Sequence, residues 1–244
     1  MPINPNTVAV IGCSHSDLDF IDNNSIPNHD QAYSWIYHAA EDFPHLEFHS
    51  FARGGQGSLY FDLCMKHAVH QGYKHVIIQL STETRFVVPI WDKTFDKPTW
   101  KKDQILKNLI NFDYQFNTVS ITSDQAIESI RQGQEDLNIK NSMFDQMFGS
   151  ATPHIYSDLF CNTIEQLYQD NFSSFIYFTA WNRENNYNNI NQSDHVFDYM
   201  FKKYGKYHCV KNLMDDSLHM NYQGSKIWYN EYLKQALQQK IILD

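Results

Sequence analysis

The chain has 244 residues, of which 42% are hydrophobic, enough for one sizeable buried core. Charged residues make up only 19% of the chain and aromatic residues 15%, a composition that excludes a disordered tail or a coiled coil. The formal net charge of -9 excludes a protein whose work is to neutralise the phosphates of a nucleic acid.

Short β-favouring runs alternate with helical patterns along the chain. Runs bounded by polar residues or glycine predict strands at residues 7–12, 46–52, 75–80, 174–180 and 206–210. Apolar residues at helical spacing predict helices at residues 31–43, 58–71, 152–170, 194–204 and 223–237. Such alternation is typical of a parallel sheet covered on both faces. We therefore predict a three-layer α/β/α fold with a five-stranded parallel sheet.

The segment from about residue 86 to residue 150 interrupts the alternation and is too long for a single crossover. We predict a mainly helical insertion in a single domain of residues 1–244, with helices near 102–112 and 124–134. Its aromatic residues, Trp91 and Trp100 among them, argue against disorder. The insertion is therefore interpreted either as a lid over a site or as a surface excursion packed on the sheet.

The cysteines and the first residues bear on the compartment. Cys13, Cys64, Cys161 and Cys209 lie far apart in the sequence, so no pair has the spacing of a zinc or redox motif. We expect reduced thiols and no metal. The first residues hold no basic segment followed by a long apolar run, which predicts neither a signal peptide nor a membrane span. These features predict a cytoplasmic protein, and they fit a virion component equally well.

Polar residues collect directly after four of the predicted strands. These loops cover residues 12–17, 53–58, 81–85 and 214–219. In an open parallel sheet the ligand site lies off the carboxyl ends of the strands, where the strand order reverses. We therefore expect the four loops to converge on one rim.

The rim offers the groups that acyl transfer requires. Ser14 is the candidate nucleophile, at a predicted junction of strand and helix where backbone N–H groups and a helix dipole favour negative charge. His219 is the candidate general base, and Asp216, three residues earlier, is the candidate carboxylate that orients it. Gly57 can bring a backbone N–H close to a substrate oxygen.

Each of these roles has a competing interpretation. Ser14 could simply cap the helix that follows it, and Ser16 is the nearest rival nucleophile. Asp215 is the rival carboxylate. His15, beside the nucleophile, is interpreted as a loop residue that points elsewhere and not as a second base.

These residues resemble the SGNH or GDSL hydrolases, a family of esterases, lipases and carbohydrate deacetylases with a flavodoxin-like fold. Residues 12–14, Gly-Cys-Ser, resemble the family's Gly-Asp-Ser motif with cysteine in place of aspartate. Gly57 matches the glycine of the second block, and residues 216–219, Asp-Ser-Leu-His, match the Asp-x-x-His block. The resemblance implies a serine esterase that forms an acyl-enzyme, needs no cofactor and acts on a small-molecule or carbohydrate ester.

The third block departs from the family pattern. The family places an Asn there whose side chain donates to the oxyanion, whereas residues 81–84 read Ser-Thr-Glu-Thr. Thr84 or Arg85 is the favoured substitute donor, beside the backbone N–H groups of Ser14 and Gly57. The missing Asn leaves a second interpretation open, an inactive binding or structural module such as a viral particle component. A flavin-phosphate site in the first loop is disfavoured, because Asp17 brings the wrong charge.

Overall fold

The structure is a computed structural model of the chain. It describes residues 3–18, 34–54, 56–81, 85–90, 106, 108–112, 117–122, 152–180, 187–190, 194–214 and 219–241. Residues 85–90, 117–122 and 152–156 are described by their backbone alone.

A parallel sheet of five strands forms the centre of the molecule. The strands are β1 (Thr7–Ile11), β2 (Glu47–Ser50), β3 (His75–Leu80), β5 (Leu109–Asn111) and β7 (Ser174–Thr179). They lie in the order β5-β2-β1-β3-β7, and every neighbouring pair is parallel. The predicted five-stranded parallel sheet is confirmed.

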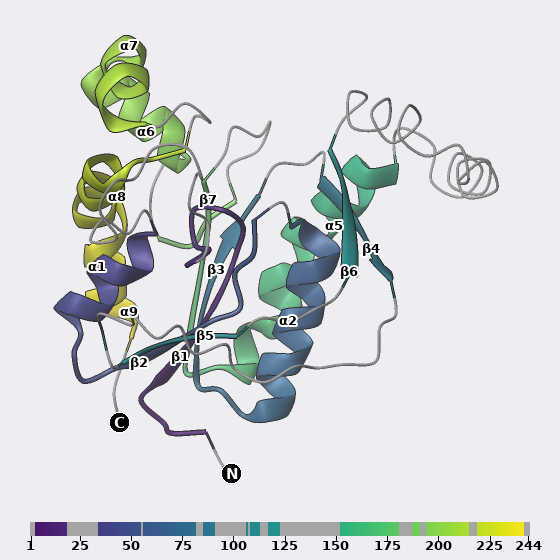
Figure 1. Cartoon of the computed structure of the whole chain (residues 1–244). Helices are drawn as coiled ribbons and strands as arrows, with labels where there is room; N and C mark the ends of the chain where they lie inside the picture. The colour runs from purple at the N-terminus through teal and green to yellow at the C-terminus, as the bar shows by residue number, and fades with distance from the viewer. Residues whose placement is uncertain are drawn as a thin grey trace.

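Helices cover both faces of this sheet, as Figure 1 shows. One layer holds α2 (Ser58–Gln71) and α5 (Thr152–Tyr168), which runs on into the short helix η2 (Gln169–Asn171). The other layer holds α1 (Trp35–Asp42), α6 (Val196–Tyr204) and the C-terminal helices. The C-terminal segments are α7 (Lys206–His208), η3 (Cys209–Leu213), α8 (Tyr222–Trp228), η4 (Tyr229–Leu233) and α9 (Lys234–Lys240). The three-layer α/β/α fold is confirmed.

Alternating side chains on the strands build a separate apolar core on each face of the sheet. Val8 and Val10 of β1 point into the layer of α1 and α8, where Trp35 is buried. Ala9 and Ile11 point into the layer of α2 and α5. Because both faces of a parallel sheet are covered, its strands read as continuous apolar runs, which is why the sequence pattern locates four of the five strands, β1, β2, β3 and β7.

The fifth predicted strand, residues 206–210, is wrong. These residues lie in the helical segments α7 and η3, because their burial follows a helical period and not an alternating one. Cys209 and Leu213, four residues apart, are buried. Tyr207 and Val210 on the other side are exposed.

The true fifth strand is β5, which lies inside the helix predicted at residues 102–112. It has only three residues and extends the sheet beyond β2 through Phe48, His49 and Ser50. The preceding Asn108 holds this edge in place, since its side-chain amide donates to the carbonyl oxygens of Ala40 at 3.0 Å and Leu46 at 2.9 Å. A strand this short carries no readable periodicity.

Two further strands form a separate two-stranded sheet. β4 (Arg85–Ile90) and β6 (Asn117–Thr122) pair antiparallel, and β4 lies beside α2 and α5. The described part of the predicted helical insertion, residues 86–150, thus contains strands. Three features of the insertion lie outside the described residues: the helix predicted at residues 124–134, Trp91 and Trp100.

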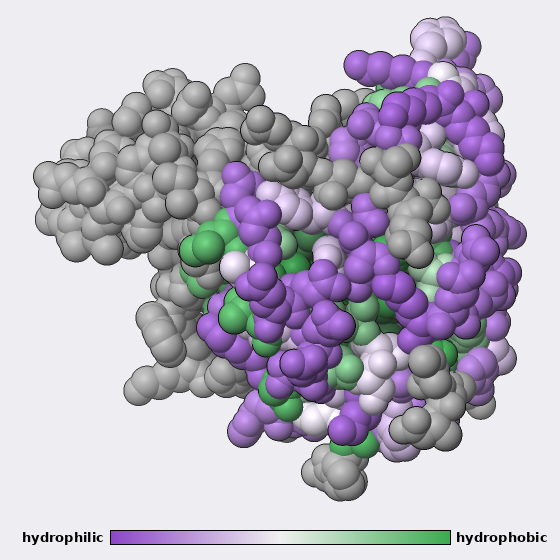
Figure 2. Space-filling model, turned by 180° about the vertical axis from the view of Figure 1, so that it is seen from behind, coloured by the Kyte–Doolittle hydropathy of each residue, from purple (hydrophilic) through white to green (hydrophobic). Residues whose placement is uncertain are grey.

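The face of the molecule drawn in Figure 2 is mainly hydrophilic over the described residues. Figure 2 shows one face, on which apolar residues form small patches between polar ones. None of the helices in the described ranges combines the length and the apolar character that crossing a membrane requires.

Candidate active site

Ser14 lies in the turn that leaves the carboxyl end of β1. The strand order reverses at β1, because β2 and β3 lie on its two sides. This is the position at which open α/β sheets bind ligands. The backbone N–H groups of Ser16 and Asp17 both donate to the carbonyl oxygen of Cys13, at 2.9 and 3.0 Å. The residues described here, up to Leu18, form this single turn and not the helix that the sequence predicts after Ser14.

A buried network of polar side chains stabilises the turn that carries Ser14. Ser16 Oγ donates to Gln79 Oε1 at 2.7 Å and accepts from the indole N–H of Trp35 at 2.8 Å. The side-chain amide of Gln79 donates to Cys13 Sγ at 2.9 Å. Ser16 and Gln79 are fully buried, so Ser16, the rival nucleophile, has a structural position beneath Ser14.

Gly12 makes room for this network. A Cβ atom at Gly12 would stand 2.9 Å from both Cβ and Oγ of Ser16 and 3.1 Å from Cβ of Gln79. The two contacts with Ser16 are shorter than real Cβ atoms show, so Ser16 would have to shift. The glycine that begins the Gly-Cys-Ser motif is therefore required by close packing against residues that flank the nucleophile.

His219 comes from the segment between η3 and α8. Met214 and Met220 form an antiparallel bridge that closes the loop, and the Asn221 N–H donates to the Leu213 carbonyl oxygen at 2.9 Å. The Asn221 side chain then caps α8 by accepting from the Gly224 N–H at 3.0 Å. These bonds fix the backbone on the C-terminal side of His219.

The structure brings His219 and Ser14 into contact. His219 Nε2 lies 2.8 Å from Ser14 Oγ, although the two residues are 205 positions apart in the chain. Ser14 is 5% exposed, and His219 is partly exposed. The hydroxyl can donate to a neutral imidazole at this distance, which is the geometry of a nucleophile beside its general base. Asp216 and its rival Asp215 lie outside the described residues.

The loop after β2 lies at the same edge of the sheet. Gly54 N–H donates to Asp17 Oδ2 at 2.7 Å, which ties this loop to the turn that carries Ser14. Gly57 has extended backbone and lies directly before the first residue of α2. Of the other predicted oxyanion donors, Thr84 and the side chain of Arg85 lie outside the described residues.

His15 does not point away from the site. Its ring is buried, and the ring centroids of His15 and His219 are 5.0 Å apart, with an interplanar angle of 40°. The His15 ring also meets Phe197 of α6 edge-on at 5.2 Å. Because His15 packs against the candidate base, the prediction that this loop residue points elsewhere is wrong.

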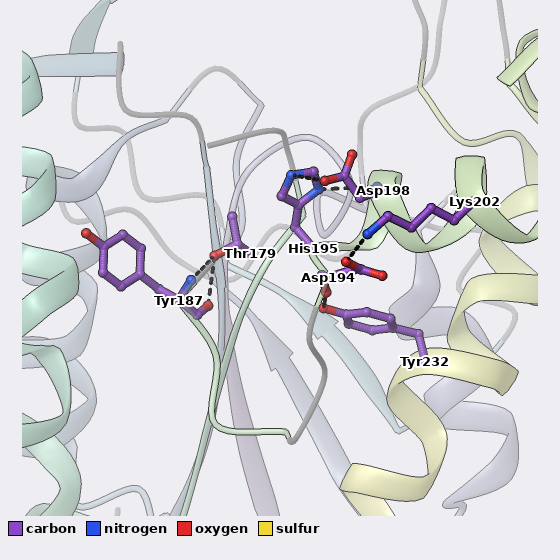
Figure 3. A network of polar contacts seen from close by, with 7 residues as sticks. All are labelled: Thr179, Tyr187, Asp194, His195, Asp198, Lys202 and Tyr232. Atoms are coloured by element: carbon purple, nitrogen blue, oxygen red, sulfur yellow. Dashed lines mark hydrogen bonds and ion pairs between the residues drawn. The ribbon is translucent and has the colours of Figure 1, made fainter. Parts of the chain in front are cut away.

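A second pairing of histidine and carboxylate lies at the start of α6, near the carboxyl end of β7 (Figure 3). His195 Nε2 is 3.0 Å from Asp198 Oδ2, and His195 Nδ1 accepts from the Asp198 N–H at 3.2 Å. Burial lowers the pKa of His195, while Asp198 and Asp194 oppose that shift. Both ring nitrogens are engaged within its own helix cap, so His195 is a structural residue and not a competing base.

The same view shows how this rim is held together (Figure 3). Thr179 Oγ1 donates to the Tyr187 carbonyl oxygen at 2.7 Å and accepts from the Tyr187 N–H at 3.1 Å. Tyr232 donates to the Asp194 carbonyl oxygen at 2.7 Å. These bonds link β7 to the loop after it and that loop to the C-terminal helices.

Sequence reasoning missed Gln79 and Trp35, which hold the nucleophile turn. One signal was readable. Gln79 is a polar residue inside the otherwise apolar end of β3, and a buried polar side chain requires a partner. The partner itself could not be read, because Ser16 and Trp35 are brought to Gln79 only by the fold.

Comparison of the sequence with protein-family models and with curated proteins finds no significant match. In the part of the chain that the structure describes, no cluster of three or more His, Cys, Asp or Glu side chains could hold a metal ion. The interpretation of the site therefore depends on its own geometry.

Proposed function

We propose that the protein is a serine hydrolase that cleaves ester bonds. The observation that carries this proposal is the 2.8 Å contact between Ser14 Oγ and His219 Nε2 at the carboxyl end of β1. Capping of a turn by the Ser14 hydroxyl does not account for its contact with an imidazole from the far end of the chain. The resemblance to the SGNH hydrolases in three sequence blocks supports the same interpretation.

The proposed reaction proceeds through an acyl-enzyme. His219 Nε2 takes the proton of Ser14 as Oγ attacks the ester carbonyl carbon and the carbonyl electrons move to oxygen. When the tetrahedral intermediate collapses, the bond to the alcohol oxygen breaks and His219 returns the proton to that oxygen. Water then attacks the acyl-enzyme with His219 as base, which releases the acid and restores Ser14.

Two further roles complete the proposal. Asp216, three residues before His219, accepts from His219 Nδ1 and stabilises the imidazolium. The backbone N–H groups of Ser14 and Gly57 donate to the oxyanion, with Thr84 or Arg85 in place of the family's Asn.

The substrate class is a small-molecule or carbohydrate ester with a short acyl group, as in the family that the chain resembles. A cytoplasmic location remains a prediction of the sequence.

The alternative is a hydrolase-like module without turnover, used for binding or as part of a virus particle. One observation favours it, the absence of the Asn in the third block at residues 81–84. One lost oxyanion donor costs roughly 3 kcal/mol of transition-state stabilisation, which slows an esterase without abolishing it. Turnover by the parent protein therefore decides between the two functions.

The experiment is the steady-state hydrolysis of p-nitrophenyl acetate by the parent and three variants. Ser14→Ala and His219→Ala should each lower kcat by about 10³-fold or more, because each removes one of two groups that act as a unit. Ser16→Ala is the comparison variant, since it removes a neighbouring hydroxyl of the same turn. Because it also removes the hydrogen bonds that hold this turn, its kcat should fall by about tenfold at most where it is folded, far less than in the other two variants. Folding of every variant is checked by circular dichroism.

Two results would contradict the proposal. A folded parent without turnover on short esters would favour the inactive module. Full activity in Ser14→Ala combined with loss in Ser16→Ala would move the nucleophile to the other serine.

A further inference from the structure

His15 touches the catalytic pair in two ways. As the residue after Ser14, it shares the backbone of the nucleophile turn. Its ring packs on the ring of His219, with centroids 5.0 Å apart. The dipeptide Ser14-His15 therefore meets His219 once through a hydroxyl and once through a tilted ring contact.

A second neighbour of the His15 ring belongs to a different element. Phe197, at the start of α6, meets His15 edge-on at 5.2 Å and is 5% exposed. The Phe197 N–H donates to the Ala180 carbonyl oxygen at 3.3 Å, which fixes the start of α6 to the end of β7. His15 is thus backed by a rigid part of the fold.

A general base works only in a narrow range of orientations. The His219 ring can rotate about its side-chain bonds, and only some orientations keep Nε2 directed at Ser14 Oγ. A buried, flat ring packed at a tilt against the imidazole removes several of these orientations, because the two rings cannot overlap. A misplacement of about 1 Å in a reacting group can cost on the order of 100-fold in rate.

We propose that His15 is a positioning residue, whose ring, backed by Phe197, holds the His219 imidazole in line with Ser14. This inference rests on the proposed esterase function. The contact is with the base and not with the reacting atoms, so His15 acts through His219. The property that matters is the planar ring of His15, not its ability to carry a proton.

The test compares kcat and KM for p-nitrophenyl acetate in the parent, His15→Phe and His15→Ala. His15→Ala removes the ring, so we expect kcat to fall about 10- to 100-fold while KM stays within about twofold. His15→Phe keeps a flat ring of similar size and should retain kcat within about threefold of the parent. His15→Leu, which keeps volume without a planar ring, replaces His15→Ala if that variant does not fold, and the same loss in kcat is expected.

His38→Ala is the matched control. His38 is also a buried histidine, and its ring packs against Tyr222 of α8 at 5.1 Å. The variant therefore lacks an imidazole that supports α8, the helix directly after His219. Its described ring contacts are with Tyr222 and Tyr229, whereas the described ring contact of His219 is with His15. We expect His38→Ala to lower stability and to leave kcat of the folded protein within about twofold.

The outcomes separate the inference from the function that it rests on. A parent without turnover contradicts the proposed function and removes the inference with it. If the parent is active, the positioning role is overturned when His15→Ala keeps the parent kcat or when His15→Phe loses as much as His15→Ala. It is also overturned when His38→Ala lowers kcat as much as His15→Ala, since the effect would then be general destabilisation.

Discussion

Two serines in one turn have opposite environments. Ser14 lies against His219, whereas Ser16, two residues later, is fully buried and bonded to Gln79 and Trp35. Sequence alone left both as candidate nucleophiles, because nothing in the Ser-His-Ser pattern shows which hydroxyl faces the rim. The partners from β3 and α1 separate the two roles.

Ser16→Ala should lower the free energy of unfolding by about 1–3 kcal/mol. The substitution leaves the Trp35 indole N–H and the Gln79 oxygen buried without their partner. Ser225→Ala is the matched control, because its buried hydroxyl has no hydrogen-bond partner among the described residues. It should cost less than about 0.5 kcal/mol. Urea denaturation measures both, and an equal loss in the two variants would contradict the role of the network.

Among the elements, the junction of η3 and α8 sets the position of His219. A Cβ atom at Gly224 would stand 2.1 Å from the Leu213 carbonyl oxygen, so the two segments approach at a distance that only glycine permits. The Asn221 N–H donates to the Leu213 carbonyl oxygen. A shift of Leu213 away from Gly224 therefore moves both ends of the loop that carries His219.

Gly224→Ala should therefore affect both stability and activity. We expect a loss of about 1–3 kcal/mol from overpacking, together with a lower kcat in the protein that remains folded. Gln223→Ala, at an exposed neighbouring position of α8, is the control and should change neither. Unchanged kcat in folded Gly224→Ala would show that the approach of these segments does not position the base.

The edge strand β5 and the segment 206–210 show where prediction from residue patterns fails. Long runs such as Ser58–Gln71 were predicted with the bounds that the structure has, because a helix of that length repeats its apolar period several times. β5 has only three residues, so no period is repeated within it. The run at 206–210 looked like a strand because Tyr207 and Val210 favour strands locally, but tertiary burial of Cys209 and Leu213 overrides that preference.

Substitutions in β5 and in the segment 206–210 show which of the two segments belongs to the sheet. Leu109→Ala should cost about 2–3 kcal/mol, since Leu109 is 2% exposed in the core beside Phe48. Val210→Ala should cost less than about 0.5 kcal/mol, since Val210 is 39% exposed. Thermal or urea unfolding measures the difference, and the reverse ranking would contradict the observed sheet.

On the scale of the whole molecule, the sequence predicted the layers and placed Ser14 and His219 on one rim. It could do so because strand ends in a parallel sheet share one edge, whatever the details of each loop. It could not predict the supports of the site. The contact of His15 with His219, like the bonds of Gln79, depends on side-chain directions that no local pattern encodes.

Buried histidines should make the folded protein sensitive to mild acid. Burial lowers the pKa of His38 from 6.5 to about 4, and the pKa values of His49 and His195 are also lowered. Below pH 6.5 the unfolded chain therefore binds protons that the folded chain does not, so stability falls as pH falls toward 4. Urea unfolding at pH 7, 6 and 5 measures this. His38→Phe should reduce the slope, and stability that rises toward pH 5 would contradict the expectation.

The most direct measurement of the central claim is the site of covalent labelling by a fluorophosphonate, which reacts with activated serine hydroxyls. Peptide mapping by mass spectrometry should find one phosphonyl group on Ser14 of the parent and none on His219→Ala, in which Ser14 has lost its base. An adduct on Ser16 or on any other serine, or labelling of Ser14 that continues undiminished without His219, would contradict the account.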